Sequence, residues 1–481
     1  MLPILNNPGG RFTSRDNLGI NSATSAMQAQ LCPVVTTVTP RAFYWPFLVW
    51  NYYEYYQIYG AKNPDPTYFE NEFLKRNDYF FVLGNLLTPS SDKDGLVGKD
   101  NANRDINEAK KKYSYNKKYF LARYGGMQYY ISGCDTLGFV TSVDDSGRTY
   151  KLPLLTENMG KPMAQAFEEV INKTRYYKLY RTGEMDVPTE VLIELGSVIG
   201  LSMSHLQECK RLLKQALFEP RSNQRLNNSR LIASSELVKF IHDVYGEEDH
   251  SSTLRNLLYQ VFPERGDNNS VPEELIPIAS QWEVVVGRQY MTLAIELIWK
   301  ELLTHLYRPV PMSVWIENTI KQSTITSVDL SLCLGQAVLK ENLSSIDIEN
   351  MIKKGYRRRS CNGNIERSVR ILFSLYNRFK ERDDIALDDL SYGFDVSLLK
   401  LLALIADNPQ MTVHDFLVRV MNEWILKKHL LVAREKMMRS SDGYYFSITD
   451  GICYKLHDAE PDFQGNRLIQ LAQVMKDLEM L

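Results

Sequence analysis

The 481-residue sequence lacks the motifs that identify several large enzyme classes. It contains no GxxxxGK[ST], GxGxxG, GxSxG or HExxH pattern, so the signatures of phosphate loops, dinucleotide-binding folds, α/β-hydrolases and zinc proteases are absent. Its six cysteines lie far apart and form no CxxC pair, which argues against a structural zinc site and favours reduced, mostly buried thiols. We therefore assign no catalytic residue, no metal ligand and no cofactor, and we favour a protein that is not an enzyme.

Signals for membranes and secretion are also missing. No run of about 20 apolar residues occurs, so neither a transmembrane helix nor a membrane partner is expected. The N-terminus, Met1 to Leu5, lacks the basic start and the apolar stretch of a secretory signal, which favours a cytoplasmic protein. Lys and Arg number 56 and Asp and Glu number 58, giving a formal net charge of −2. This balance excludes a wholly basic nucleic-acid coat protein but leaves room for local blocks of charge.

The composition is that of a globular protein, with 44% apolar and 24% charged residues. Helical spacing of apolar residues recurs along most of the chain, and strand-like runs are largely confined to two short hairpins. We predict a mainly α, multi-domain helical protein with two winged-helix-like modules, whose β-hairpins lie near 139–152 and 444–456. The predicted segments are an irregular N-terminal arm (1–35), an N-terminal domain with a winged-helix-like module (36–160), a helical bundle (161–310), a helical region with a basic patch (311–395) and a C-terminal winged-helix-like domain (396–481).

Aromatic residues are unusually frequent, at 11% of the chain, and several form one stripe. Leu48, Tyr52, Tyr55 and Tyr59 repeat at helical spacing before Gly60, which predicts a helix that ends at this glycine. Such rings can stack on bases, but we favour the interpretation that the stripe is a packing face.

The first basic region precedes the first hairpin. Residues 99–123 contain eight Lys or Arg against three Asp or Glu, a local charge of 8 − 3 = +5. A short helix is predicted within 126–138, followed by the hairpin. A helix followed by a hairpin is the arrangement of a winged helix, in which the helix enters a groove of the nucleic acid and the hairpin is the wing. Clustered bases bind phosphate by releasing counterions, so we predict nucleic-acid contacts at Lys110, Lys111, Lys112, Lys117, Lys118, Arg123 and, on the wing, Arg148.

A second basic region lies farther along the chain. Residues 353–382 contain ten Lys or Arg and two Glu, a local charge of 10 − 2 = +8. Five bases surround Tyr356, and we predict that they also contact nucleic acid: Lys353, Lys354, Arg357, Arg358 and Arg359. Five Asp follow between Asp383 and Asp395, which leaves open that the basic patch is neutralised within the chain or serves as an interdomain latch.

The helix predicted in the second half of this basic region, before the five aspartates, has an apolar face and a basic face. The apolar side contains Val369, Leu372, Phe373, Tyr376 and Phe379, and the basic side contains Arg367, Arg370, Arg378 and Arg382. We expect the basic side to be presented to a partner.

The C-terminal region repeats the pattern of the first module. Three helices are predicted between residues 396 and 438, the second beginning at Thr412, and the second hairpin follows. The final helix, from Arg467, is expected to pack back on this module.

Two alternative sites remain open. His242, Asp243, Asp249 and His250 are types of residue that ligate divalent metals, although a solvated helix end explains the cluster more simply. A nuclease site assembled from dispersed residues such as Glu283, Arg288, Glu296 and Lys300 leaves no readable motif; pairing at i, i+4 explains the last two more simply.

Three short segments, Gly126–Val140, Glu296–Leu303 and Asp442–Phe446, resemble uncharacterised helical subunits of prokaryotic anti-phage defence systems. The resemblance implies a defence-complex subunit whose protein partner is a helicase or nuclease, and it carries over no functional residue.

Together these observations predict a non-catalytic subunit of a multi-protein complex that binds DNA or RNA or acts as a scaffold. The alternatives are a metal-dependent nuclease with dispersed acidic residues and a pure protein–protein adaptor.

Overall fold

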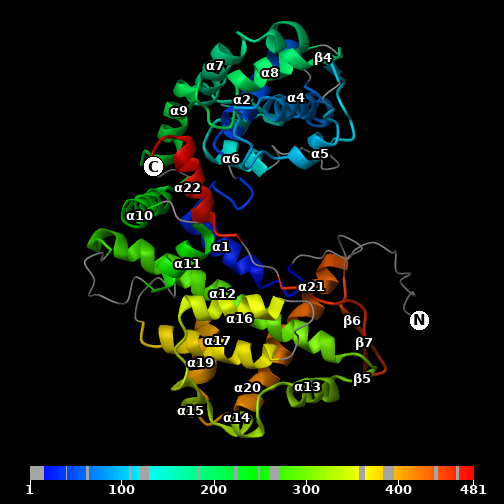
Figure 1. Cartoon of the computed structure of the whole chain (residues 1–481), viewed down its shortest axis with the longest axis vertical. Helices are drawn as coiled ribbons and strands as arrows, with labels where there is room; N and C mark the ends of the chain where they lie inside the picture. The colour runs from blue at the N-terminus through cyan, green and yellow to red at the C-terminus, as the bar shows by residue number, and fades with distance from the viewer. Residues whose placement is uncertain are drawn as a thin grey trace. The chain divides into compact units, whose positions relative to one another are not determined.

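Figure 1 shows the computed structural model of the chain. The structure describes residues 16–481 except 40, 61–63, 108–109, 120–128, 145, 183–184, 221–225, 247–249, 261–270, 357–362, 383–394, 438–442 and 462–464, and the side chains of 250–253, 260, 356 and 437. In the described part, helices dominate and the sheets have two or three antiparallel strands, so the predicted mainly α fold is confirmed. No helix of this part is both long enough and apolar enough to cross a membrane.

The chain divides into two compact units. Unit 1 consists of Met1–Gln28 and Glu248–Gly465, and unit 2 consists of Ala29–Glu247 and Asn466–Leu481. Helix α1 (Asn21–Leu31) crosses the boundary at Gln28. The five predicted segments are thus grouped into two units, and their finer boundaries stay a prediction.

Unit 2 is built around aromatic rings. Phe43 stacks on Phe81 with the ring centroids 4.4 Å apart, and Phe47 and Trp50 pack against Phe167. The elements of unit 2 are α2 (Tyr44–Tyr59), α3 (Pro66–Tyr68), the π-helix η1 (Phe69–Phe73), α4 (Leu74–Leu87), α5 (Lys99–Asn103), β1 (Lys112–Tyr113), α6 (Ile131–Thr136), β2 (Val140–Val143), β3 (Thr149–Leu155), α7 (Gly160–Ile171), the π-helix η3 (Tyr176–Tyr180), β4 (Val187–Pro188), α8 (Thr189–Val198), α9 (Gln207–Phe218), α10 (Ser229–Tyr245) and α22 (Arg467–Asp477).

Unit 1 is built around the 30-residue helix α12, which is buried along most of its length. Trp299 of this helix packs against Trp315, His429 and Phe446, which come from three other elements. The elements of unit 1 are α11 (His250–Gln260), the 3-10 helix η4 (Glu273–Leu275), α12 (Ile276–His305), β5 (Val310–Pro311), α13 (Met312–Lys321), α14 (Ser327–Ser331), α15 (Leu334–Val338), α16 (Ser345–Tyr356), α17 (Asn364–Phe379), α19 (Leu398–Ala406), α20 (Val413–Arg419), the π-helix η5 (Val420–Leu426), α21 (Lys427–Met437), β6 (Phe446–Thr449) and β7 (Ile452–Lys455).

The sheet of unit 1 joins distant parts of the chain. Its strand order is β5-β7-β6, so Val310 pairs with Cys453 and the β6–β7 hairpin is extended by a third strand. The ends of the segment 334–411 meet, because Leu334 N donates to Met411 O at 2.8 Å and Val413 N donates to Leu332 O at 3.0 Å. On either side of this segment, the order of elements is α12, β5, α13 and α14 before it and the long helix α20–η5–α21 and the hairpin after it.

Several local expectations are confirmed. Helix α2 ends at Gly60, whose φ of 76° suits a residue without a side chain. Both predicted hairpins form, as β2–β3 and β6–β7. The packing interpretation also holds for Leu48, Tyr52 and Tyr55, which are buried.

Other expectations are wrong. The segment predicted as an irregular arm contains the helix α1, although residues 1–15 lie outside the described part. The two helices predicted after Thr412 are one continuous helix, α20–η5–α21, because no breaker interrupts it. Helix α22 does not pack on the C-terminal module; it packs against α10 and belongs to unit 2.

Candidate nucleic-acid interface

Backbone hydrogen bonds fix the segment 110–118 within unit 2, and its lysine side chains are exposed to solvent. Tyr113 is fully buried, β1 pairs with β4, and Thr189 N donates to Lys111 O at 3.0 Å. The side chains on the outside are all exposed: Lys110, Lys111, Lys112, Lys117 and Lys118. Five of the predicted contact residues therefore lie on one surface segment, which we call the lysine segment.

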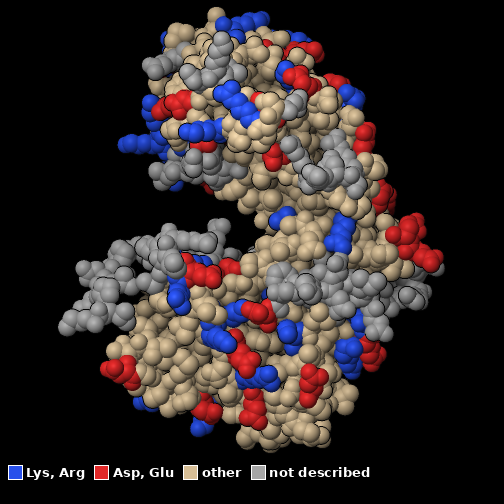
Figure 2. Space-filling model, turned by 180° about the vertical axis from the view of Figure 1, so that it is seen from behind, with Lys and Arg blue, Asp and Glu red and all other residues tan. Residues whose placement is uncertain are grey.

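The charge of the lysine segment is largely uncompensated within the described residues. Lys117 forms an ion pair with Glu72, with 3.1 Å between Nζ and Oε1. Lys110 Nζ lies 4.7 Å from the centre of the Tyr113 ring. No described carboxylate forms an ion pair with the other four lysines. Figure 2 shows Lys and Arg side chains gathering along one edge of unit 2.

An exposed pair of tyrosines lies near Glu72, the ion-pair partner of Lys117. Glu72, the partner of Lys117, belongs to η1, which directly follows Tyr68. Tyr68 is 41% exposed and Tyr59 is 45% exposed, and their ring centroids are 5.6 Å apart. The far end of the aromatic stripe is thus accessible, unlike the buried Tyr52 and Tyr55. Exposed rings beside cations are a common arrangement for binding single strands.

The hairpin that we predicted to be a wing is present, and Arg148 lies beside a carboxylate there. Arg148 is exposed beside the β2–β3 turn, and its guanidinium carbon lies 5.1 Å from the centre of the Tyr150 ring. Asp144 organises the turn by accepting from Ser146 Oγ, Tyr150 Oη and the backbone N–H of Arg148. These hydrogen bonds, above all the one from Ser146, lower the pKa of Asp144 to about 2. Asp144 is therefore ionised at neutral pH, and its negative charge lies beside Arg148.

The predicted recognition helix is described only in its C-terminal part. Helix α6 has six residues, and its only described neighbour toward the N-terminus is a short turn, because 120–128 lie outside the described part. Arg123 falls in that gap.

The second predicted patch lies in unit 1. Lys353 and Lys354 are exposed in the last turn of α16, and Lys353 Nζ is 3.8 Å from Glu349. Arg357, Arg358 and Arg359 lie outside the described residues.

The basic side of α17 does not face a partner, contrary to our expectation. Arg378 and Arg382 both form ion pairs with Glu283 of α12, which is 5% exposed. Arg370 pairs with Glu341 at 3.4 Å. These ion pairs fasten α17 to α12 within unit 1, because the buried carboxylate of Glu283 needs a paired cation.

The residues considered for a dispersed nuclease site have structural partners. Arg288 is buried and donates to the carbonyl oxygens of Ile20 and Val396. Glu296 accepts from Asn21 at 2.8 Å, and Lys300 pairs with Glu460 at 3.2 Å. Among the described residues, no group of three His, Cys, Asp or Glu is placed to hold a metal. Asp249 and the side chain of His250 lie outside that part.

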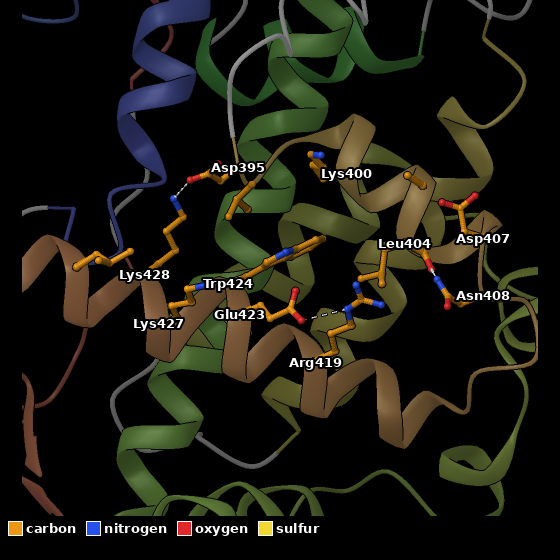
Figure 3. A pocket seen from close by; sticks show the side chains of 13 residues that line it. Asp395, Lys400, Leu404, Asp407, Asn408, Arg419, Glu423, Trp424, Lys427 and Lys428 are labelled. Carbon is orange, nitrogen blue, oxygen red and sulfur yellow. Dashed lines mark hydrogen bonds and ion pairs between the residues drawn. The ribbon is translucent and has the colours of Figure 1, made fainter.

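Sequence reasoning missed a hollow in unit 1, shown in Figure 3. Its volume is about 500 Å³. It lies between α19 and the long helix α20–η5–α21, and its lining is Asp395, Val396, Lys400, Ala403, Leu404, Asp407, Asn408, Arg419, Glu423, Trp424, Lys427, Lys428 and Leu431. The neighbouring lysines 427 and 428 can be seen in the sequence. That they line a hollow cannot, because the opposite wall is α19, which lies near them only in the folded chain.

Comparison with known proteins identifies no relative. No family model matches the chain, and no curated protein or solved structure matches it significantly.

Proposed function

We propose that the chain is a non-catalytic nucleic-acid-binding subunit of a multi-protein complex and that the lysine segment is its main contact. The observation that carries the proposal is the fixed backbone of 110–118 with five exposed lysines, four of which have no ion pair with a described carboxylate. A fixed array of cations binds phosphates with little loss of backbone entropy, and each contact releases counterions.

The tyrosines beside the segment favour single strands over duplexes. Tyr68 lies about one helical turn before Glu72, the partner of Lys117, and the half-exposed Tyr59 packs edge-to-face on Tyr68. A strand that follows the lysines can place an unpaired base on these rings, and a stacked base contributes about 1–3 kcal/mol.

The order of elements in unit 1 supports a winged-helix module there. A helix, a short strand, further helices and a hairpin follow one another, and the short strand β5 pairs with the second hairpin strand β7. The module of unit 2 is less complete, since β2 and β3 form a two-stranded sheet without a third strand from the described residues. A helicase or nuclease partner in a defence complex remains part of the proposal on the resemblance alone.

Fluorescence anisotropy with labelled single-stranded DNA, single-stranded RNA and duplex DNA at several salt concentrations tests the proposal. We expect salt-dependent binding, strongest for a single strand. Replacing Lys110, Lys111 and Lys112 together by Ala should reduce the slope of log K against log salt by about 0.7 for each phosphate of a single strand that the variant no longer binds. The matched control replaces the dispersed lysines Lys161, Lys173 and Lys214 of the same unit, which removes the same charge.

Two results would overturn the proposal. Equal reductions in affinity for the test and control variants would mean that only net charge matters, and absence of salt-dependent binding would favour the adaptor alternative. Cleavage of DNA with Mg²⁺ or Mn²⁺ that an acid-to-Ala substitution abolishes would favour the nuclease alternative.

A further inference from the structure

Cations line the hollow of unit 1 on both of its walls. Lys428 forms an ion pair with Asp395, and Lys400 and Lys427 line the same hollow from α19 and α21. All three ammonium groups lower the pKa of Asp395, the hydrogen bond from Lys428 most strongly. Neither Lys400 nor Lys427 forms an ion pair with a described carboxylate. Among the described residues near this carboxylate, Asp395 thus faces three ammonium groups, of which only Lys428 is paired with it.

The end of the hollow away from Asp395 has a different character. Asp407 and Asn408 follow the end of α19, and Arg419 pairs with Glu423 at 3.3 Å. Figure 3 shows Asp395, Lys427 and Lys428 toward one end and Asp407, Asn408 and Arg419 toward the other. The carboxylate of Asp407 forms no ion pair with a described cation, so it can accept hydrogen bonds from a ligand.

Apolar side chains lie between the two ends. The Trp424 ring extends between α19 and the long helix in Figure 3, and Leu404 lies beyond it. Trp424 is 7% exposed, so its surroundings hold the ring in place, whereas Leu431 at the rim is 47% exposed. Trp424 belongs to the π-helical segment η5, and π-helical turns recur where a helix is adapted to a functional site.

We propose that this hollow binds one nucleotide, either free or as a unit of a nucleic-acid strand. Its phosphate lies between Lys400 and Lys427, its base packs against the parts of Trp424 and Leu404 that line the hollow, and Asp407 accepts a hydrogen bond from the sugar or the base. The volume of about 500 Å³ falls within the range of sites for small ligands. The doubly charged phosphate of a mononucleotide matches Lys400 and Lys427, neither of which is paired with a carboxylate in the described part of the chain.

Isothermal titration of the full chain with AMP, inorganic phosphate, adenosine and a short 5′-phosphorylated oligodeoxythymidine tests the proposal. We expect AMP to bind more tightly than either phosphate or adenosine, because each of these keeps only half of the contacts. Binding of the oligonucleotide but not of AMP, with the same response to the variants below, would assign the nucleotide to a strand. Absence of binding by both AMP and the oligonucleotide up to millimolar concentration would overturn the proposal.

Variants separate the two ends of the site. Replacing Lys400 and Lys427 together by Gln should weaken nucleotide binding at least tenfold, while the matched replacement of the exposed Lys321 and Lys340 of unit 1 should not. Asp407→Asn should weaken AMP binding and leave phosphate binding unchanged. Unfolding midpoints near that of the wild type establish that each variant is folded. Equal affinities for wild type and the Lys400/Lys427 variant would remove the assignment.

The outcome is independent of the lysine segment. Replacing Lys110, Lys111 and Lys112 should leave AMP binding unchanged even if it abolishes strand binding. If the lysine segment does not bind nucleic acid, AMP can still bind to the hollow. If AMP does not bind, strand binding can still depend on salt through the lysine segment.

Discussion

Arg41 and Asp477 form a buried ion pair that joins the residues before α2 to the last helix of the chain. Both side chains are 2% exposed, and Arg41 Nη2 lies 2.8 Å from Asp477 Oδ1. Asp477 also accepts from the backbone N–H of Ala42 at 2.8 Å, and Arg41 also pairs with Asp92. Because the surrounding hydrogen bonds satisfy both ions, the pair fixes α22 in unit 2 although 436 residues separate the partners.

Asp477→Ala should destabilise unit 2 by about 3–5 kcal/mol, because it leaves the buried Arg41 guanidinium without its main partner. The control is Glu157→Ala, which breaks the exposed Lys161–Glu157 pair and should cost less than about 1 kcal/mol. Urea unfolding followed by tryptophan fluorescence measures both. Similar midpoint shifts for the two variants would show that Arg41 finds another partner or water.

Gly84 and Gly196 allow α4 and α8 to touch backbone to backbone. A Cβ atom on Gly196 would lie 2.3 Å from Gly84 O, and one on Gly84 would lie 2.7 Å from Leu192 O. Gly196→Ala should therefore separate the helices and destabilise unit 2 by at least about 1–3 kcal/mol. Gly200→Ala is the control, since its nearest atom would be 3.5 Å away. Thermal unfolding that shifts equally in both variants would contradict the close approach.

Features set by neighbours in the sequence were predictable. The end of α2 at Gly60 and the two hairpins follow from local turn and capping chemistry. The strand β5 was not predictable, because two residues of ordinary composition gain their role only by pairing with β7.

In the candidate sites too, local features were predictable from the sequence and contacts between distant residues were not. The exposed lysines of 110–118 were visible as a run of charge. The function of Arg378 and Arg382 was not, because their partner Glu283 lies about 95 residues earlier and nothing in the local pattern points to it. The hollow of unit 1 was missed for this reason also, since Lys400 and Lys427 belong to separate helices.

His429 should make unit 1 sensitive to acid. The ring is fully buried, its Nδ1 lies 3.0 Å from Asn17 O, and Tyr445 N donates to its Nε2 at 3.0 Å. The ring is thus held as the neutral tautomer with hydrogen on Nδ1, and burial lowers its pKa to about 4.

The folded-state pKa of His429 lies below the value of about 6.5 for an unfolded chain. The stability that the neutral ring provides is therefore present above pH 6.5 and is lost as pH falls toward 4, by up to on the order of 3 kcal/mol. His429→Gln should remove this dependence, and the exposed His205→Gln should not. Urea midpoints measured at pH 4.5, 5.5 and 6.5 make the comparison, and parallel curves for wild type and His429→Gln would refute it.

Glu301 should produce a pH dependence of the opposite sign. Its carboxylate is fully buried, and its Oε2 accepts from the backbone N–H of Asn364 at 2.9 Å, where α17 begins. Burial raises the pKa of Glu301 to about 7, although this hydrogen bond and the charge of Arg367 act to lower it.

Because the folded state binds the Glu301 proton more tightly than the unfolded chain, unit 1 loses stability as pH rises from about 4.5 to 7 and is insensitive above that range. This loss partly cancels the gain from His429, so the wild type should show a shallow profile. Glu301→Gln keeps an acceptor for Asn364 but cannot ionise. Relative to wild type, its stability should therefore increase between pH 4.5 and 8 by up to on the order of 3 kcal/mol, as measured by urea unfolding. A constant difference across this range would mean that Glu301 titrates alike in both states.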